Sequence, residues 1–518
     1  MLIEHLHRVQ DRFGHLSQQH LAALAHEMRL SQAQVYEVAS FYHHFDLVHE
    51  GQPAPAPLTV RVCTGLSCEL AGAADLLDQL LALFGPQVRV LPAPCIGRCE
   101  QAPAVAVGHH AVAPASAQLV LESARHGGDR LAPHPFANRA DYEAGGGYQL
   151  LRSCVAGERD LDTLIDELER SGLRGLGGAG FPAGRKWRIV RDEPAPRLMA
   201  VNLDEGEPGT FKDRYYLERD PHRFLEGMLI AAWAVGAQRI LIYLRDEYHA
   251  CRAMLTQQLA GLQADPPVVG MPKIELRRGA GAYVCGEESA MLESIEGRRG
   301  LPRLRPPYVA QVGLFGRPTL VHNFETLYRV RDILDKGADW FASQGRNGRR
   351  GLRAFSVSGR VREPGVKLAP AGITLRELID EHCGGMAEGH QLHAYLPGGA
   401  SGGILPASMA NIALDFDTLQ PHGCFIGSGA VIVLSQQDSV VAAARNLMRF
   451  FRDESCGQCT PCRLGTARAL ELIEQPRWDQ KLLAELSAVM RDASICGLGQ
   501  AAPNPVDCVI RYFGQDLQ

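Results

Sequence analysis

The spacing of hydrophobic residues divides the chain into segments of different character. Helical spacing dominates residues 2–49, and the order strand, helix, strand is predicted over 58–91. Short alternating strands with Gly and Pro turns are predicted from Arg353 to about Leu434, around one helix, and residues 440–453 form a predicted amphipathic helix. This succession indicates an α/β protein of several domains.

The helical pattern near the start predicts a helix that begins close to Ser31. Val35, Val38, Phe41 and Phe45 are expected on its recurring faces, so the helix should continue through residue 45.

The longest apolar run extends from Phe224 to Leu244. It contains Glu226 and Arg239 and breaks at Gly236. We therefore expect a buried helix followed by a strand, and no membrane span.

Composition narrows the class of protein. The chain has 518 residues, enough for three or four domains, and a net charge of -5. It should be soluble, without general attraction to nucleic acid or anionic membranes. The first ten residues are polar and charged, which indicates no signal peptide and a cytoplasmic location.

A glycine-rich stretch, SGLRGLGGAGFPAGRKW, spans Ser171 to Trp187. Glycines let a backbone approach a ligand without Cβ atoms in the way, and their N–H groups can face a phosphate. Lys186 adds a positive charge, while Phe181 and Trp187 offer flat apolar surface. The stretch predicts a cradle for a phosphorylated aromatic cofactor, with a surface loop as the alternative. Because a helical pattern at 160–170 precedes it, an ordinary Rossmann turn is disfavoured.

Carboxylates follow a predicted strand at 198–201. Asp204, Glu205 and Glu207 fall within four residues, at the end of a strand where α/β sheets bind ligands. They are either solvated or in contact with donors on a ligand, and the second interpretation is favoured.

A second glycine-rich segment, RRGAGAYVCGEESAMLESIE, covers residues 277–296. Glu287 and Glu288 precede a helix, whose first turn favours carboxylates. An acidic residue facing a ribose hydroxyl would alternatively select NAD over NADP. Cys285 is interpreted as a packed residue. Further on, the loop 398–403 is expected to touch a neighbouring domain.

Fourteen cysteines without an export signal favour metal binding over disulfides. One set has C-x4-C and C-x3-C spacing at the same end of a predicted sheet, and its wide gaps favour [2Fe-2S] over zinc. The members of this set are Cys63, Cys68, Cys95 and Cys99.

The second set is a C-x2-C-x2-C run with a remote fourth cysteine, which is typical of [4Fe-4S], with zinc as the alternative. Its members are Cys456, Cys459, Cys462 and Cys496. The cysteines outside both sets, other than Cys285, are expected in cores. They are Cys154, Cys251, Cys383, Cys424 and Cys508.

Four of these segments closely resemble the flavoprotein subunit of the NADH dehydrogenase (complex I) family. They are the glycine-rich stretch, NLDEGEPGTFKDR, GAGAYVCGEES, and SCGQCTPCR followed by ICGLG. The front of the chain, with ASFYHHF and the first cysteine set, resembles that family's thioredoxin-like [2Fe-2S] subunit. Such a fusion is similar to the diaphorase subunit of NAD-reducing hydrogenases and to the β subunit of NAD-dependent formate dehydrogenases that contain molybdenum or tungsten.

The resemblance implies five domains in an α/β multidomain fold. They are N-terminal helices (1–50), a thioredoxin-like [2Fe-2S] domain (51–130), an FMN- and NAD-binding α/β domain (150–345), a β-grasp-like module (346–435) and a C-terminal helical bundle with [4Fe-4S] (436–518).

The resemblance also implies the ligand contacts. FMN would be held by Gly175, Gly177, Gly178, Lys186, Asn202, Asp204, Tyr283, Gly286, Glu287 and Asn323. NAD would contact Phe181, Glu207, Glu288, Arg305 and Tyr308. No side chain is expected to act as general acid or base, because the flavin carries out the hydride transfer.

Of these two kinds of subunit, the formate dehydrogenase β subunit is favoured, because the segments LPGGASGGILP and HGCFIGSGAVIVLSQQDSV resemble it. The expected role is the electron-output subunit, which takes electrons from a formate-oxidising α subunit through iron–sulfur clusters to FMN and then NAD⁺. The alternatives are the diaphorase subunit of an NAD-reducing hydrogenase, a flavin-free iron–sulfur relay, and a zinc-stabilised interaction module.

Overall fold

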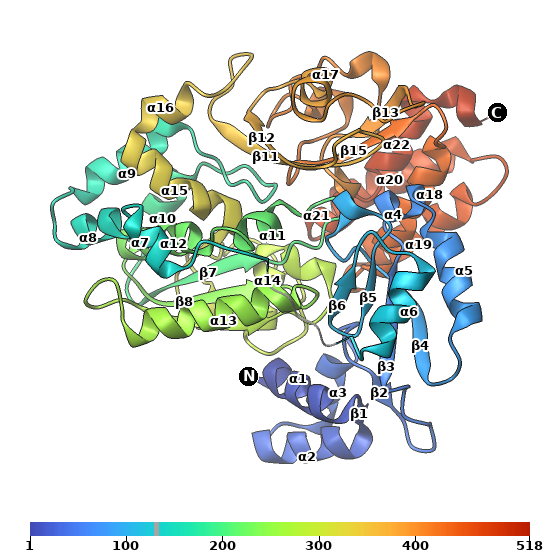
Figure 1. Cartoon of the computed structure of the whole chain (residues 1–518), viewed down its shortest axis with the longest axis horizontal. Coiled ribbons are helices and arrows are strands. Elements are labelled where there is room, and N and C mark those ends of the chain that lie inside the picture. The colour runs from blue at the N-terminus through green and yellow to red at the C-terminus, as the bar shows by residue number, and fades with distance from the viewer. Residues whose placement is uncertain (129–133, 518) are drawn as a thin grey trace.

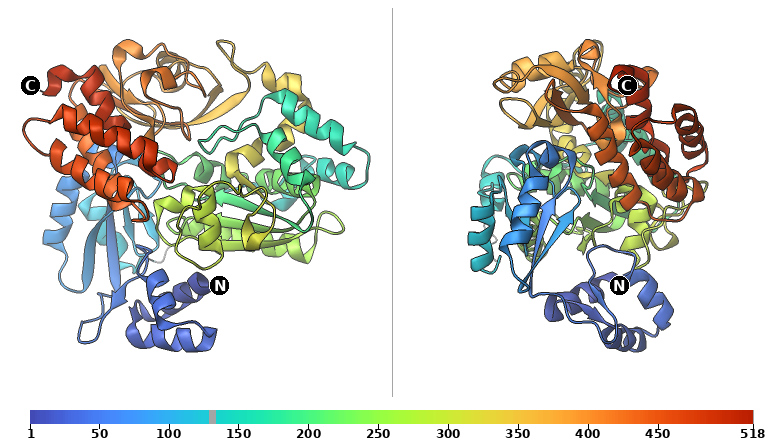
Figure 2. Two further views of the ribbon diagram at one scale, coloured as in Figure 1. Left: turned by 180° about the vertical axis from the view of Figure 1, so that it is seen from behind. Right: turned by 90° about the vertical axis from the view of Figure 1, so that its right-hand side faces the viewer.

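The computed structural model describes residues 1–128 and 134–517. Figure 1 shows a central α/β domain (green), a strand-rich module above it (orange), and C-terminal helices (red) above a small α/β domain (blue). Three helices at the N-terminus lie along one edge of this body, at the bottom of Figure 1 and of the view from behind in Figure 2. The predicted α/β multidomain class is confirmed.

The central domain is built on a parallel four-stranded sheet in the order β10-β7-β8-β9. Helix α12 (Pro221–Val235) precedes β8 (Ala237–Leu244), which confirms the predicted buried helix and strand. Gly227 faces the Leu327 carbonyl of α15 (Phe324–Lys336) so closely that a Cβ would collide, so glycine is what lets the two helices pack.

The other strands of this sheet are β7 (Arg197–Leu203), β9 (Lys273–Arg278) and β10 (Thr319–Asn323). The other helices of the domain are α7 (Arg139–Ala144), α8 (Gln149–Val155), α9 (Leu161–Ser171), α10 (Ala183–Asp192), α11 (Lys212–Leu217), α13 (His249–Ala264), α14 (Glu288–Ile295) and α16 (Ala338–Ala342).

The small α/β domain has the sheet order β4-β3-β5-β6. Strands β3 and β4 run parallel, as expected, and β5 and β6 form a hairpin. The predicted helix between β3 and β4 is present as α5, and the short α4 precedes it. Its predicted boundary at residue 130 lies outside the described residues. The elements are β3 (Leu58–Cys63), α4 (Leu66–Leu70), α5 (Ala73–Leu83), β4 (Val88–Ala93), β5 (Val105–Val107), β6 (His110–Val112) and α6 (Ala117–Arg125).

The N-terminal helices end earlier than predicted. Helix α3 (Gln32–Ala39) does not continue to Phe45, because the chain turns toward the central domain. The N–H of His44 donates to the Ala280 carbonyl at 3.2 Å, and Tyr42 and Phe45 are buried. The remaining elements of this segment are α1 (Leu2–Phe13), α2 (Gln18–Met28), β1 (Leu16–Ser17) and β2 (Leu47–Val48).

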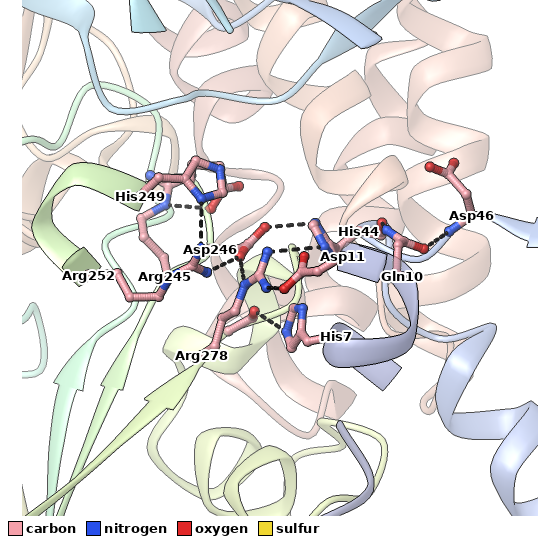
Figure 3. A network of polar contacts seen from close by, with 12 residues as sticks. His7, Gln10, Asp11, His44, Asp46, Arg245, Asp246, His249, Arg252 and Arg278 are labelled. Carbon is pink, nitrogen blue, oxygen red and sulfur yellow. Dashed lines mark hydrogen bonds and ion pairs between the residues drawn. The ribbon is translucent and has the colours of Figure 1, made fainter. Parts of the chain in front are cut away.

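A buried polar network ties this segment to the central domain (Figure 3). His44 Nδ1 lies 2.7 Å from a carboxylate oxygen of Asp246, and Arg278 bonds to both Asp246 and Asp11. Burial raises the pKa of Asp246, but His44 and Arg278 outweigh it and hold that pKa well below the usual value. His7, His44 and Asp246 lie close enough to resemble metal ligands, yet the arginine already neutralises the carboxylate.

The strand-rich module has the order β12-β11-β15-β13-β14 and helical residues at 375–382, as predicted. Its elements are β11 (Leu352–Gly359), β12 (Gly365–Pro370), α17 (Leu375–Glu377), β13 (Leu392–Leu396), β14 (Leu405–Pro406) and β15 (Ala430–Ser435).

The C-terminal helices pack against one another beside the small α/β domain (Figure 2). Helix α18 (Val440–Asp453) has the predicted bounds, and its side chain Asn446 donates from Nδ2 to the Thr64 carbonyl at 2.9 Å. No helix in the described part of the chain is both long and apolar enough to cross a membrane. The other helices are α19 (Thr460–Ile473), α20 (Gln480–Ala493), α21 (Gly497–Ala501) and α22 (Asn504–Tyr512).

Candidate functional site

The glycine-rich stretch forms a loop between α9 and α10, against the carboxyl end of the central sheet. The Leu176 N–H donates to Thr326 Oγ1 at 2.9 Å, which joins the loop to the start of α15. A Cβ on Gly177 would lie 3.0 Å from Asn323 Cβ, and Gly178 has φ +125°. The backbone conformation at residue 178 favours glycine, and Gly177 is tightly packed. The predicted FMN residues Gly177 and Asn323 therefore lie side by side.

Trp187 does not offer the flat ligand surface that we expected. It is fully buried, and its Nε1 donates to His322 Nε2 at 2.9 Å. The prediction was wrong because α10 turns this ring toward the sheet. Phe181 and Tyr308, the two aromatics expected near NAD, are 39% and 55% exposed and remain available to a ligand.

Glu205 is neither solvated nor directed at a ligand site. It is buried and accepts hydrogen bonds from the N–H of Asp213 at 2.8 Å, the N–H of Arg214 at 3.1 Å and Tyr248 Oη at 2.9 Å. Its carboxylate therefore accepts hydrogen bonds from main-chain N–H groups in the first turn of α11 that have no partner within the helix. The three carboxylates after β7 do not act as one group.

Glu207 joins three segments that are distant in sequence. Tyr283 Oη donates to it, and Ser401 donates from its main-chain N–H at 2.8 Å and from Oγ at 2.7 Å. This contact bears out the expectation that the loop 398–403 touches a neighbouring domain. Ser401 carries no local motif, so the sequence did not single it out.

Two buried polar atoms at this end of the sheet have no partner among the described residues. They are Asp204 Oδ2 and Asn323 Nδ2. Burial raises the pKa of Asp204 to about 8, so its carboxyl group is largely protonated at neutral pH. Buried polar groups normally have partners. A polar ligand such as FMN, rich in hydrogen-bonding groups, fits here, and Asn202 is fixed nearby through Nδ2 to the Gly286 carbonyl at 2.8 Å.

The acidic pair at the start of α14 combines helix capping with ion pairing. Glu287 accepts from the N–H groups of Ser289 and Ala290, both at 2.9 Å, so it caps the helix. Arg305 Nη2 lies 2.5 Å from Glu287 Oε1 and 3.0 Å from Glu288 Oε1. Glu288 also lies 3.7 Å from Lys186. Lys186 also donates to the Val321 carbonyl at 3.2 Å. The capping role that the sequence allowed for Glu287 is thus confirmed, and Glu288 belongs to a charged cluster.

The second cysteine set lines a single cavity, together with Val284 of the central domain. The cavity is lined by Cys456, Cys459, Cys462 and Cys496. Burial raises the pKa of the Cys462 thiol to about 12 and that of Cys496 to about 11, so metal binding must displace their protons. Four thiols around one small cavity fit a [4Fe-4S] cluster.

The first cysteine set is fully buried in the small α/β domain. Cys63 ends β3 and Cys95 follows β4, and the Cys95 and Cys99 sulfurs lie 3.3 Å apart. Contacts with Cys68 and Cys95 raise the pKa of Cys63 well above its usual value. A Cβ on Gly65 would lie 3.4 Å from Cys95 Cβ and 3.6 Å from the Cys63 sulfur, so this loop also stays close to the thiols. The arrangement fits [2Fe-2S].

The remaining cysteines are buried, as predicted. Cys285 packs against Gly300 and takes no part in the site. Cys424 and Cys508 lie 3.5 Å apart and join the strand-rich module to α22, a pairing that the sequence did not reveal.

Four family descriptions match successive parts of the chain. Residues 1–124 match the Thioredoxin-like [2Fe-2S] ferredoxin, 168–332 the Nuo51 FMN-binding domain, 355–405 the SLBB domain, and 442–518 the NADH-ubiquinone oxidoreductase-F iron-sulfur binding region.

Known relatives match across most of their length. The chain is 40% identical to an NADH-quinone oxidoreductase subunit of Rhizobium meliloti (strain 1021) over 386 residues, which cover 72% of this chain and 91% of the relative. It is 41% identical to the mitochondrial NADH dehydrogenase [ubiquinone] flavoprotein 1 of Dictyostelium discoideum over 379 residues, 70% of this chain and 79% of the relative. This chain belongs to the family of complex I flavoprotein subunits.

Family membership confirms the predicted set of cofactors, FMN, [2Fe-2S], [4Fe-4S] and NAD. Among solved structures, the chain is similar to an NAD+-reducing [NiFe]-hydrogenase in the H2-reduced state, with a TM-score of 0.87 and 32% identity. The match covers 100% of this chain and 91% of the other chain. The match therefore includes the fusion with the [2Fe-2S] domain.

Proposed function

We propose that the chain is the diaphorase subunit of an NAD-dependent formate dehydrogenase. It would accept electrons from an α subunit that contains molybdenum or tungsten and would reduce NAD⁺. The domain bounds and the FMN, NAD and cluster residues given above are part of this proposal. When bound, FMN supplies the chemistry that exchanges a hydride with nicotinamide and single electrons with iron–sulfur clusters.

One observation carries the proposal of an electron path within the chain. Val284 lines the cavity of the second cysteine set, and it directly follows Tyr283, one of the residues proposed for FMN. The main-chain N–H of Tyr283 donates to Glu454 at 2.9 Å, and Glu454 lies two residues before Cys456. The segment proposed to hold flavin therefore forms one wall of the cluster site.

Several side chains proposed to contact NAD are held in place by polar contacts within the chain. Tyr283 and Ser401 hold the Glu207 carboxylate, while Lys186 and Arg305 hold Glu288. These side chains would orient the nicotinamide nucleotide over the flavin, and none of them needs to transfer a proton. Phe181 offers exposed aromatic surface for the adenine.

Formate is favoured as the donor by the resemblance of LPGGASGGILP and HGCFIGSGAVIVLSQQDSV to formate dehydrogenase β subunits. The match to an NAD+-reducing hydrogenase over the whole chain supports hydrogen as the alternative donor.

The deciding experiment is anaerobic purification of the native assembly, followed by NADH formation with formate or with hydrogen. Formate-dependent NADH formation supports the proposal. NADH formation with hydrogen alone would establish the alternative. The flavin absorbance of the same preparation tests the flavin-free relay, which predicts no flavin.

A further inference from the structure

An arginine-lined cavity of about 240 Å³ lies between the glycine-rich loop and the strand-rich module. Arg174, Arg349, Arg350 and Arg353 line it, together with Asp415. None of the residues proposed for FMN, NAD or either cluster lines this cavity. It is therefore separate from the site described above.

Arg353, the buried arginine of this group, has hydrogen-bond donors without acceptors in the part of the chain that the structure describes. Arg353 is 2% exposed and donates from Nη2 to Asp415 at 3.1 Å. Its Nε and Nη1 have no partner within residues 1–128 and 134–517. A buried guanidinium with two unpaired donors is costly. An anion in the cavity would offset its charge.

The carboxylates present do not neutralise the arginines. Asp415 is shared, because Arg349 also donates to it at 2.7 Å. Arg174 pairs with Asp417, and Arg350 is exposed at the cavity without an ion pair among the described residues. Glu325 also acts on the charge of Arg353, but it pairs with Lys212. The four guanidinium groups still outnumber the carboxylates beside them, which leaves a positive potential inside a partly enclosed space.

Neighbouring aromatic surface keeps two of these arginines in place. The guanidinium carbons of Arg353 and Arg174 lie 4.2 and 4.5 Å from the centre of the Phe416 ring. Such stacking orients a guanidinium without using its N–H donors. Arg174 uses Nε for the Gly180 carbonyl and Nη1 for Asp417, whereas Arg353 keeps Nε and Nη1 unpaired with respect to the residues that the structure describes. The two guanidinium groups are therefore held in place beside the cavity before any anion binds.

We infer that this cavity is a binding site for a free oxyanion of the phosphate class. Guanidinium groups match the geometry of phosphate oxygens. The volume is below the roughly 300–1,000 Å³ of typical small-molecule sites, which favours a small ion over a nucleotide. The site also borders the flavin loop, since Arg174 Nε donates to the Gly180 carbonyl.

The test is isothermal titration of the flavin-loaded full-length protein with inorganic phosphate, in a buffer free of phosphate and sulfate. We expect one saturable site, absent from Arg353→Gln. Arg350→Gln should weaken phosphate binding about tenfold, as expected for loss of one hydrogen bond to a charged group. Arg362→Gln is the matched control, since Arg362 is an exposed arginine of the same module that does not line the cavity.

Flavin absorbance must be equal in all samples, so that the FMN site is occupied and is not the source of binding. Absence of saturable phosphate binding to the wild-type protein would overturn the inference, as would unchanged affinity in folded Arg353→Gln. If that variant does not fold, unchanged affinity in Arg350→Gln overturns it. Glycerol 3-phosphate should bind more weakly than phosphate, and tighter binding would contradict a free oxyanion.

Discussion

Arg245 Nη2 donates a hydrogen bond of 2.7 Å to the main-chain carbonyl of Cys95. Arg245 follows β8 of the central domain and is 4% exposed, whereas Cys95 belongs to the [2Fe-2S] set. Arg245 Nη1 donates to the main-chain carbonyl of Glu205. Burial lowers the pKa of Arg245, but Glu247 and neighbouring groups outweigh it and raise that pKa well above the usual value. A permanent positive charge therefore lies beside the proposed cluster.

We predict that Arg245→Met lowers the midpoint potential of the [2Fe-2S] cluster. Loss of a nearby positive charge favours the oxidised, less negative cluster, by on the order of 50 mV. A redox titration followed by electron paramagnetic resonance measures the change. Arg245→Lys should stay near the wild-type potential because it keeps the charge. Arg239→Met, elsewhere on β8, is the control, and an equal shift in that variant would contradict a local effect.

Gly177→Ala should weaken FMN binding by about tenfold or more, the effect of a steric cost of about 1–3 kcal/mol. The new Cβ would lie 3.0 Å from Asn323 Cβ and push the loop away from the end of β10. The ratio of flavin to protein after dialysis measures the loss. Gly261→Ala is the control, because nothing lies within 4 Å of a Cβ at that helical position. Full flavin retention in Gly177→Ala would argue against FMN at this loop.

Glu288→Gln should improve the use of NADP relative to NAD by about tenfold in kcat/KM. The change removes a carboxylate that would repel a 2′-phosphate, and it frees Lys186 to bind that phosphate, while Arg305 keeps its ion pair with Glu287. Steady-state kinetics with both nucleotides gives the ratio. Glu293→Gln, on the same helix, is the control. Unchanged discrimination in Glu288→Gln would remove Glu288 from the nucleotide site.

Asp246→Asn should loosen the N-terminal helices from the central domain, at a cost of about 3–5 kcal/mol for breaking a buried ion pair. Because the folded-state pKa of Asp246 lies below its unfolded value, its stabilisation is present above the ordinary carboxyl pKa of about 4. It is lost as the pH falls through the folded-state pKa.

Limited proteolysis of the linker at residues 51–57 measures this release. We expect faster cleavage of Asp246→Asn than of wild type at pH 7, and a smaller difference only in strong acid. Asp265→Asn is the control, since Asp265 pairs with Arg139 at an exposed position. Equal cleavage rates at pH 7 would show that the network in Figure 3 does not hold the segment.

Chemistry carried by local spacing was predictable from the sequence. The two cysteine sets and the glycine loop depend on which residues are neighbours in the chain, and both sets are brought together in the structure. The helix and strand of 224–244 were also predictable, because hydrophobic periodicity reflects which face an element buries.

The sequence by itself therefore determined the succession of elements and the cofactor set, since both depend on residues that are close together in the chain. Only the tertiary structure decided that Trp187 is buried, that Glu205 supports α11, that α3 ends at Ala39, and that Val284 forms a wall of the cluster cavity. These outcomes depend on contacts between segments up to hundreds of residues apart. The packing and burial of those segments against one another determine the free energy of folding. No local sequence pattern specifies which distant segments will be in contact.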